Sequence, residues 1–185
     1  MRVITGSARG KKLFSLEGLE TRPTSDMVKE SIFSIIQFDV AGASVLDLFA
    51  GSGQLGIEAL SRGAEHCVFV DENIKAIEIV KQNLNHTGFM SKSRVVRMDS
   101  IDFLKCAKKG IDIALLDPPY NMSILQKALP LVENIMSENG IVVCEHEAKL
   151  ELPQEVGRLQ KAKSYRYGKI ELTVYRTPDT DTEEE

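Results

Sequence analysis

The sequence has few cysteines and no long apolar run, and both absences narrow the kind of protein it encodes. Its three cysteines, Cys67, Cys106 and Cys144, are odd in number, scattered and without C-x-x-C spacing. They predict buried thiols of a reducing compartment rather than disulfides or zinc ligands. No run approaches the roughly 18 apolar residues of a membrane span, and residues 1–13 lack the apolar core of a secretory signal. We therefore expect a cytoplasmic protein that does not contact a membrane.

Charge is segregated along the chain. The 185 residues suffice for one domain with a core, and the net charge of −4 excludes a uniformly basic nucleic-acid coat. Residues 1–16 nevertheless carry +4 and residues 158–176 carry +5, whereas residues 17–157 carry −8 and residues 177–185 carry −5. The basic flanks either form one face for a polyanion or simply solvate surface strands. The acidic tail is predicted to be disordered.

From residue 44 onward, short apolar segments alternate with segments of helical periodicity. We expect strands at 44–49, 66–71, 94–99, 111–117 and 140–147, and helices at 54–62, 73–85, 101–107 and 124–136. Repeated βαβ units of this length predict an α/β fold, in which a parallel sheet is covered by helices on both faces.

The two ends of the chain predict smaller elements. Residues 158–176 have the pattern of an antiparallel hairpin around Tyr167 and Gly168, at the sheet edge. Residues 2–16 predict a small basic hairpin, and a helix is expected from Pro23 to Gln37, with Thr24, Ser25 and Asp26 at its start. We find no repeat or linker. We expect one domain with these parts: an N-terminal hairpin over 1–16, a capping helix over 22–37 and a core over 44–176, followed by the tail.

A glycine-rich turn follows the strand predicted at 44–49. Residues 51–56 match G-x-G-x-x-G between a strand and a helix, and Asp71 lies twenty residues after Gly51, at the end of the next strand. This context is typical of a nucleotide-binding βαβ unit, although a glycine turn can be purely structural. Gly51, Ser52 and Gly53 are the predicted contacts, with Asp71 on the ribose hydroxyls.

A carboxylate near this turn favours one ligand over another. Asp47 lies four residues before Gly51, and a carboxylate repels a pyrophosphate but attracts a cation. S-adenosylmethionine, which has a ribose, an ammonium and a sulfonium, therefore fits better than a dinucleotide. Asp99 ends the third strand, and Ser100 follows it. They predict contacts with the adenine amine, or Asp99 caps the next helix, and the two roles are compatible.

The segment from Asp117 to Tyr120, with sequence DPPY, ends the fourth strand. Two prolines stop the sheet and provide no N–H, so the exposed polar groups are acceptors, the Asp117 carboxylate and the Pro118 carbonyl. Two acceptors suit an exocyclic amine that attacks a methyl sulfonium, with catalysis mostly by positioning. Pro119 and Tyr120 would contact the base, Tyr120 by stacking. The alternative is a turn that merely terminates a strand.

Three segments together resemble the RsmD family of bacterial rRNA methyltransferases: residues 22–33, residues 46–64 with sequence LDLFAGSGQLGIEALSRGA, and DPPY at 117–120. The resemblance runs from Met1 to about Arg176. It implies a Rossmann-like class I methyltransferase fold with a mostly parallel, seven-stranded sheet. It also implies methyl transfer from S-adenosylmethionine to a guanine amine, N2 of position 966 in 16S rRNA. The substrate would be 16S rRNA or a small-subunit assembly intermediate.

The same resemblance implies further site residues. Arg22, Thr24 and Asp26 would lie over the methionine end of the cofactor, and Arg9, Lys11 and Lys12 would contact RNA phosphates. The three histidines share no metal-ligand spacing with the cysteines, so we expect no metal.

Three alternatives remain at this point. DPPY alone does not choose among base amines, so methylation of an adenine amine is possible, although so short a chain offers no evident DNA-recognition domain. A nicotinamide-dependent oxidoreductase would use the same glycine pattern. A non-catalytic RNA-binding module would retain the fold, but the intact DPPY argues against it.

Overall fold

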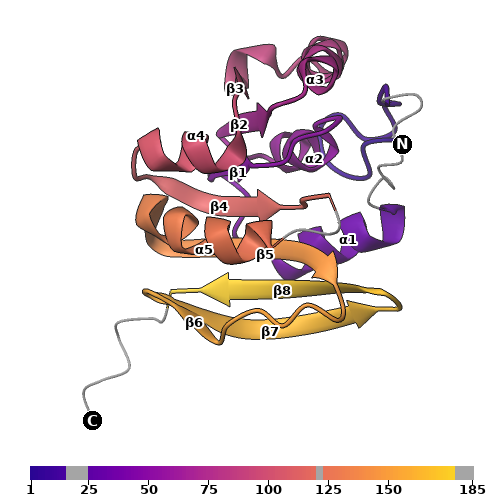
Figure 1. The fold of residues 1–185 in the computed structure, drawn as a ribbon. Coiled ribbons are helices and arrows are strands. Elements are labelled where there is room, and N and C mark those ends of the chain that lie inside the picture. The colour runs from indigo at the N-terminus through magenta and orange to yellow at the C-terminus, as the bar shows by residue number, and fades with distance from the viewer. Residues whose placement is uncertain (16–24, 120–122, 178–185) are drawn as a thin grey trace.

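One mixed sheet runs through the molecule, with helices on both of its faces (Figure 1). The structure is a computed structural model that describes residues 1–15, 25–119 and 123–177. Within these residues the sheet has eight strands in the order β3-β2-β1-β4-β5-β8-β7-β6. The first five strands in this order are parallel to one another, as the repeated βαβ pattern predicts.

The strands fall into a parallel and an antiparallel group. The parallel strands are β1 (Ser44–Asp47), β2 (His66–Asp71), β3 (Ser93–Arg97), β4 (Ile111–Leu116) and β5 (Met136–Glu147). The antiparallel strands are β6 (Glu155–Val156), β7 (Leu159–Tyr167) and β8 (Ile170–Arg176). The C-terminal hairpin is thus confirmed. The expected count of seven is one short, because the two-residue β6 pairs with β7 at the outer edge.

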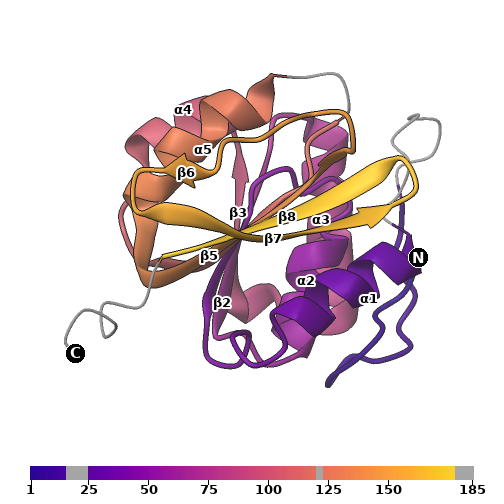
Figure 2. The same ribbon diagram turned by 90° about the horizontal axis from the view of Figure 1, so that it is seen from below.

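Helices cover the two faces in separate groups (Figure 2). The first face is covered by α1 (Asp26–Ile35), α2 (Gln54–Ser61) and α3 (Ile74–Thr87), and the second by α4 (Ser100–Cys106) and α5 (Ile124–Ile135). A 3₁₀ turn, η1 (Met90–Lys92), leads into β3. Alternation along the strands divides the core accordingly, so that Val45 packs on the first side and Leu46 on the second.

Several element boundaries differ from the sequence prediction. Ser25 caps α1 by accepting a hydrogen bond from the Val28 N–H at 3.2 Å, and the helix ends at Ile35 rather than Gln37. β5 starts at Met136 rather than Gly140, because Met136 pairs with Ile111 across an irregularity in register. The local sequence pattern does not predict such a pairing between residues that are distant in the chain. None of the described helices has the length and apolar character needed to cross a membrane.

The N-terminal segment forms the expected small hairpin, closed by one antiparallel bridge between Arg2 and Lys12. It is fastened to α2 by a buried carboxylate, Glu58, which accepts hydrogen bonds from the N–H groups of Ile4 at 2.7 Å and Thr5 at 2.9 Å. These contacts satisfy two donors that the short hairpin itself leaves unpaired. The hairpin is therefore part of the packed structure rather than a loose arm.

The cysteine prediction is correct for two of the three thiols. Cys67 and Cys144 are buried, and burial raises the pKa of each thiol. Cys106 is exposed, because it is the last residue of α4 and faces solvent. The prediction of three buried thiols is wrong at that position.

Candidate active site

Three aspartates of the candidate site lie on the same side of the sheet. Asp47 ends β1, Asp71 ends β2, and Asp117 directly follows β4. Each lies two residues after a side chain of the core on the α1–α3 side: Val45, Phe69 and Leu115. Since side chains two apart share a face, the three carboxylates lie on that side, at the carboxyl ends of adjacent parallel strands. The sheet thus brings together acids that are up to seventy residues apart in the sequence.

The three carboxylates are not at the same depth. Asp47 is in register with Phe69 on one side and Leu115 on the other. Asp71 and Asp117 are therefore two residues, or about 7 Å, further along the strand direction. They lie at the rim of the sheet, whereas Asp47 lies inside it.

Asp47 is buried, with 1% of its surface exposed, and it accepts a hydrogen bond from the Gly56 N–H at 2.9 Å. Burial raises its pKa from the ordinary 3.8 to about 7, and the nearby Asp117 and Asp71 add to the rise, although the Gly56 hydrogen bond opposes it. Asp47 thus lies below the rim that Asp71 and Asp117 form, and its contact with a cationic ligand stays a prediction. The side chain supports the start of α2 from below.

The glycine turn has the conformation that its sequence predicts. Gly51 and Gly53 have φ of 53° and 77°, a region that favours glycine, and Gly53 is the residue before α2. A Cβ on Gly51 would meet no atom within 4 Å, so the turn has open space beside it. Asp71 holds this turn by accepting the Gly51 N–H at 2.9 Å and the Asn73 N–H at 2.8 Å.

These residues fit S-adenosylmethionine. The Asp71 carboxylate accepts two backbone hydrogen bonds out of the about four that a carboxylate can accept, which leaves capacity for ribose hydroxyls. Gln54, the first residue of α2, is 7% exposed, and its Oε1 has no hydrogen-bond partner among the described residues. A buried acceptor without a donor beside an open glycine turn suits a ligand that carries ammonium and hydroxyl groups. Ser52 is half-buried in the same turn.

Asp99 occupies the position next along this edge of the sheet. Its Oδ1 accepts hydrogen bonds from the N–H groups of Ile101 at 2.9 Å and Asp102 at 3.0 Å, so it caps α4 as one of the two expected roles requires. The carboxylate is exposed and Ser100 is buried. Contact of this pair with an adenine amine stays a prediction.

The DPPY segment leaves the sheet beside the glycine turn, since β4 is the direct neighbour of β1. Asp117 is half-buried, Pro118 buried and Pro119 exposed. Tyr120 lies outside the described residues, as do Arg22 and Thr24. The stacking role of Tyr120 and the cofactor contacts of Arg22 and Thr24 stay predictions.

The basic N-terminal residues differ in what they contact. Arg9 and Lys12 have exposed side chains. The ammonium of Lys11 instead donates to the carbonyls of His86 at 3.2 Å and Thr87 at 3.3 Å, at the end of α3. Lys11 is thus occupied in part by a helix C-terminus, where a cation is favourable. Asp26, expected near the cofactor, is 3.6 Å from the guanidinium of Arg2.

The N-terminal flank and the middle of the C-terminal flank lie at the same end of the molecule, whereas Arg158 and Arg176 lie at the other end, in ion pairs with Glu133 and Asp39. The N-terminal hairpin and the turn between β7 and β8 are found at the end of the sheet where the parallel strands terminate, with α1 between them (Figure 1). This arrangement favours the first of the two explanations offered for the charge segregation, a shared face for a polyanion.

Asn83, a buried residue of α3, was not anticipated. Its Nδ2 donates to the carbonyls of Ser52 at 2.9 Å and Phe14 at 3.0 Å, and its Oδ1 accepts the Phe14 N–H at 2.8 Å. It therefore ties the glycine turn to the N-terminal segment. Its only trace in the sequence is a polar residue beside Leu84, on the apolar side of a predicted helix.

No group of three or more histidine, cysteine, aspartate or glutamate side chains is placed to hold a metal ion within the described parts of the chain. His146 is buried and its Nε2 lies 2.8 Å from the Thr173 hydroxyl, while its Nδ1 lies 2.9 Å from the Glu147 carbonyl. Its ring is engaged in hydrogen bonds of the β5–β8 pair.

Residues 1–176 match the model of a protein family described as Conserved hypothetical protein 95, and its relatives named ribosomal RNA small subunit methyltransferase D identify it as the RsmD family. The chain belongs to this family. Among its relatives is the Bacillus subtilis protein named "Putative rRNA methyltransferase YlbH", 45% identical over 181 residues that cover 95% of this chain and 98% of the relative. Ribosomal RNA small subunit methyltransferase D of Haemophilus influenzae is 35% identical over 80% of this chain and 79% of its own length.

A solved structure agrees with this assignment. "Putative methyltransferase yhhF" from Escherichia coli superposes with a TM-score of 0.86 at 30% identity, covering 96% of this chain and 97% of its own. The RsmD-family protein is thus an rRNA methyltransferase, as predicted. The oxidoreductase alternative is set aside by the same findings.

Proposed function

We propose that this RsmD-family enzyme methylates the N2 amine of a guanine in small-subunit rRNA. The guanine and its N2 atom rest on the family, whose relatives are named for the ribosomal small subunit. The observation that carries the proposal is the position of Asp117 and Pro118, which directly follow β4, the neighbour of β1, and so lie at the same edge of the sheet as the glycine turn.

Asp117 and Pro118 orient the amine. The Asp117 carboxylate and the Pro118 carbonyl each accept one N–H of the substrate amine, which draws the nitrogen lone pair out of conjugation with the ring. The chain then needs to hold the nitrogen in line with the methyl group, and such positioning is worth several kcal/mol, of order 7–11 in favourable cases. When bound, S-adenosylmethionine supplies the electrophilic methyl group on its sulfonium. Asp117 is placed to accept the proton that the methylated amine sheds.

We assign cofactor binding to residues at the same edge of the sheet, at the ends of β1, β2 and β3. Gly51, Ser52 and Gly53 form the turn, Asp71 receives the ribose hydroxyls, and Asp99 with Ser100 receives the adenine amine. Because the rim carboxylates Asp71 and Asp117 flank β1, they create a negative potential where the sulfonium and ammonium would lie. Asp47 adds to that potential only to the extent that it is ionised.

The remaining assignments concern the contacts with RNA. Arg9 and Lys12 contact phosphates of the RNA, and Lys11 does so only with the donors that its helix contacts leave free. Arg22 and Thr24 keep the roles that the family resemblance implies, and Tyr120 stacks on the target base. We place the reaction in the cytoplasm, on 16S rRNA or a small-subunit assembly intermediate.

The test is methyl transfer to rRNA by wild-type protein and by Asp117→Ala. Small-subunit rRNA and assembly intermediates from cells that lack the gene are incubated with enzyme and tritiated S-adenosylmethionine, and the product is mapped by mass. We expect N2-methylguanosine with the wild type. We expect a rate loss of 100-fold or more, roughly 3 kcal/mol, with Asp117→Ala, and S-adenosylhomocysteine affinity within about threefold of wild type.

A matched control is Glu138→Ala. Glu138 is an exposed acid of β5 at the opposite end of the sheet, so its removal changes net charge equally without touching the site. Methylated adenosine in place of methylguanosine would contradict the proposed base, and normal transfer by Asp117→Ala would contradict the mechanism.

A further inference from the structure

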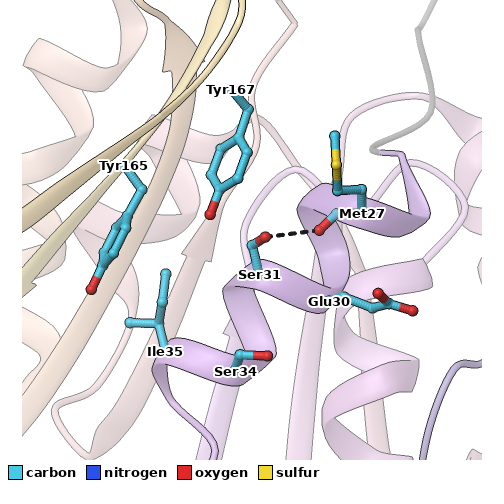
Figure 3. Close-up of a pocket in the computed structure, with 7 residues that line it drawn as sticks. All are labelled: Met27, Glu30, Ser31, Ser34, Ile35, Tyr165 and Tyr167. Atoms are coloured by element: carbon cyan, nitrogen blue, oxygen red, sulfur yellow. Dashed lines mark hydrogen bonds between the residues drawn. The ribbon is translucent and has the colours of Figure 1, made fainter.

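A groove lies between α1 and β7, outside the residues assigned to the site (Figure 3). Its volume is about 560 Å³, and its lining includes Met27, Glu30 and Ser31 of α1 and Tyr165 and Tyr167 of β7. Sites for small organic groups are typically ~300–1,000 Å³ in volume. The groove is therefore large enough for a nucleobase.

The two tyrosines present an aromatic wall. They are two residues apart in β7, so both project from the same face of the strand, and Figure 3 shows both rings directed toward α1. Each is half-buried and packs in part against the core beneath. An aromatic ring that is fixed at its base and open at its face is suited to stacking on a heteroaromatic ring.

The α1 side offers complementary groups. Met27 is 61% exposed and provides a polarisable apolar contact. The hydroxyl of Ser31 donates to the Met27 carbonyl at 2.9 Å, so its oxygen keeps acceptor capacity. Glu30 also lines the groove, but its carboxylate is directed away from the two tyrosines (Figure 3). The groove thus combines a stacking wall with an apolar contact and a hydroxyl acceptor for a base edge.

The groove opens beside the catalytic edge. Tyr167 ends β7 and pairs with Ile170, which pairs with Glu147 at the carboxyl end of β5. β5 is the neighbour of β4, which Asp117 follows. Three strand spacings separate Tyr167 from Asp117, or about 14 Å across the sheet. This is a span that a few nucleotides of a single strand cover.

Basic residues border the tyrosines. Lys163 is exposed two residues before Tyr165 and so shares its face, and Lys169 is exposed in the turn after Tyr167. They belong to the segment 158–176, which carries +5. Stacking rings with flanking cations are the combination that binds single-stranded nucleic acid, and the cations make a polyanion the favoured occupant.

We propose that this groove binds a nucleotide of the RNA substrate that flanks the target base, with its base stacked on Tyr165 and Tyr167. The inference rests on the proposed function, because it requires an RNA whose target base is presented at the DPPY edge. Base stacking is tolerant of sequence, so the groove positions the strand and adds affinity rather than selecting the target.

The test compares Tyr167→Leu with Tyr167→Phe. Leucine keeps apolar packing and removes the stacking face, whereas phenylalanine keeps the face and removes the hydroxyl. With small-subunit rRNA as substrate, we expect Tyr167→Leu to raise KM about tenfold with kcat and S-adenosylhomocysteine affinity unchanged, and Tyr167→Phe to match wild type. Tyr165→Leu serves as a second variant if the first is poorly folded, as judged by its thermal midpoint.

An abasic scan separates stacking from a structural effect. Fragments of the rRNA that carry one abasic residue at successive positions around the target are bound to wild type and to Tyr167→Leu. At one position we expect the abasic change to weaken wild-type binding about tenfold and to leave the variant unaffected. Equal loss in both proteins at every position, or unchanged KM for Tyr167→Leu, would overturn the inference. Absence of rRNA methylation by the wild type would instead refute the proposed function, and the binding scan still decides on the groove.

Discussion

Asp47→Asn provides a quantitative test of how the site is built. Asp47 is buried inside the sheet, and its pKa is raised to about 7 by desolvation first and by Asp117 and Asp71 second. Asparagine has nearly the same shape, and its Oδ1 can still accept a hydrogen bond from the Gly56 N–H. Unlike the aspartate, however, the amide does not ionise over this pH range. The substitution therefore removes one titration and leaves the packing largely intact.

The direction of the pH effect follows from linkage. Below about pH 3 the aspartate is protonated in both folded and unfolded chains, and it makes no pH-dependent contribution. Between 3.8 and about 7 the folded protein keeps the proton that the unfolded chain has lost, so stability falls as pH rises. The rise in pKa from 3.8 to about 7 lowers the free energy of unfolding by on the order of 4 kcal/mol at pH above the folded pKa.

The assay is urea unfolding of wild type and Asp47→Asn over a range of pH. All other titrating groups are common to both proteins, so their contributions cancel in the difference between the two free energies of unfolding. We expect the stability of Asp47→Asn relative to wild type to improve by about 2–3 kcal/mol between pH 5 and pH 7. A difference that is constant over that range would show that Asp47 is ionised in the folded protein, and the burial argument would fail.

Two further predictions follow from packing. Gly56→Ala places a Cβ 2.3 Å from Phe69 Cε1 and 2.7 Å from Cys67 Sγ. We therefore expect it to lower the free energy of unfolding by about 1–3 kcal/mol, whereas Glu78→Ala, at an exposed position of α3, should cause no such loss. Equal stability of the two variants would refute close packing of α2 on β2. Thiol alkylation of the folded protein, followed by mass spectrometry, should show rapid modification of Cys106, because it alone of the three thiols is exposed. Equally fast labelling of Cys67 would contradict its burial.

The local features of the site were predictable from the sequence because each depends on a short segment. The glycine turn needs residues of positive φ immediately after a strand, and the strand and helix patterns around residues 51–56 are unambiguous. The capping role of Asp99 is likewise local, since the N–H groups that it accepts belong to the next three residues. Even the shared face of Asp71 and Asp117 follows from the alternation of strands in a parallel sheet.

The local sequence pattern does not determine the register between paired strands or how deeply a side chain lies below the edge of the sheet. Asp47 lies within the strand expected at 44–49, and only the pairing of this strand with β2 and β4 shows that its carboxylate is two residues below the rim and buried. β5 likewise begins four residues early, through a pairing of Met136 with Ile111 that no local signal announces.

The sequence by itself determined the fold class and the glycine turn after β1, because periodicity and turn residues act over a few positions. Only the tertiary structure decided that Glu58 and Asn83 lock the N-terminal hairpin to α2 and to the glycine turn. It also decided that Tyr165 and Tyr167 face α1 across a groove. These contacts join segments that are distant in the chain, and their partners are set by how helices pack on a twisted sheet rather than by the residues on either side.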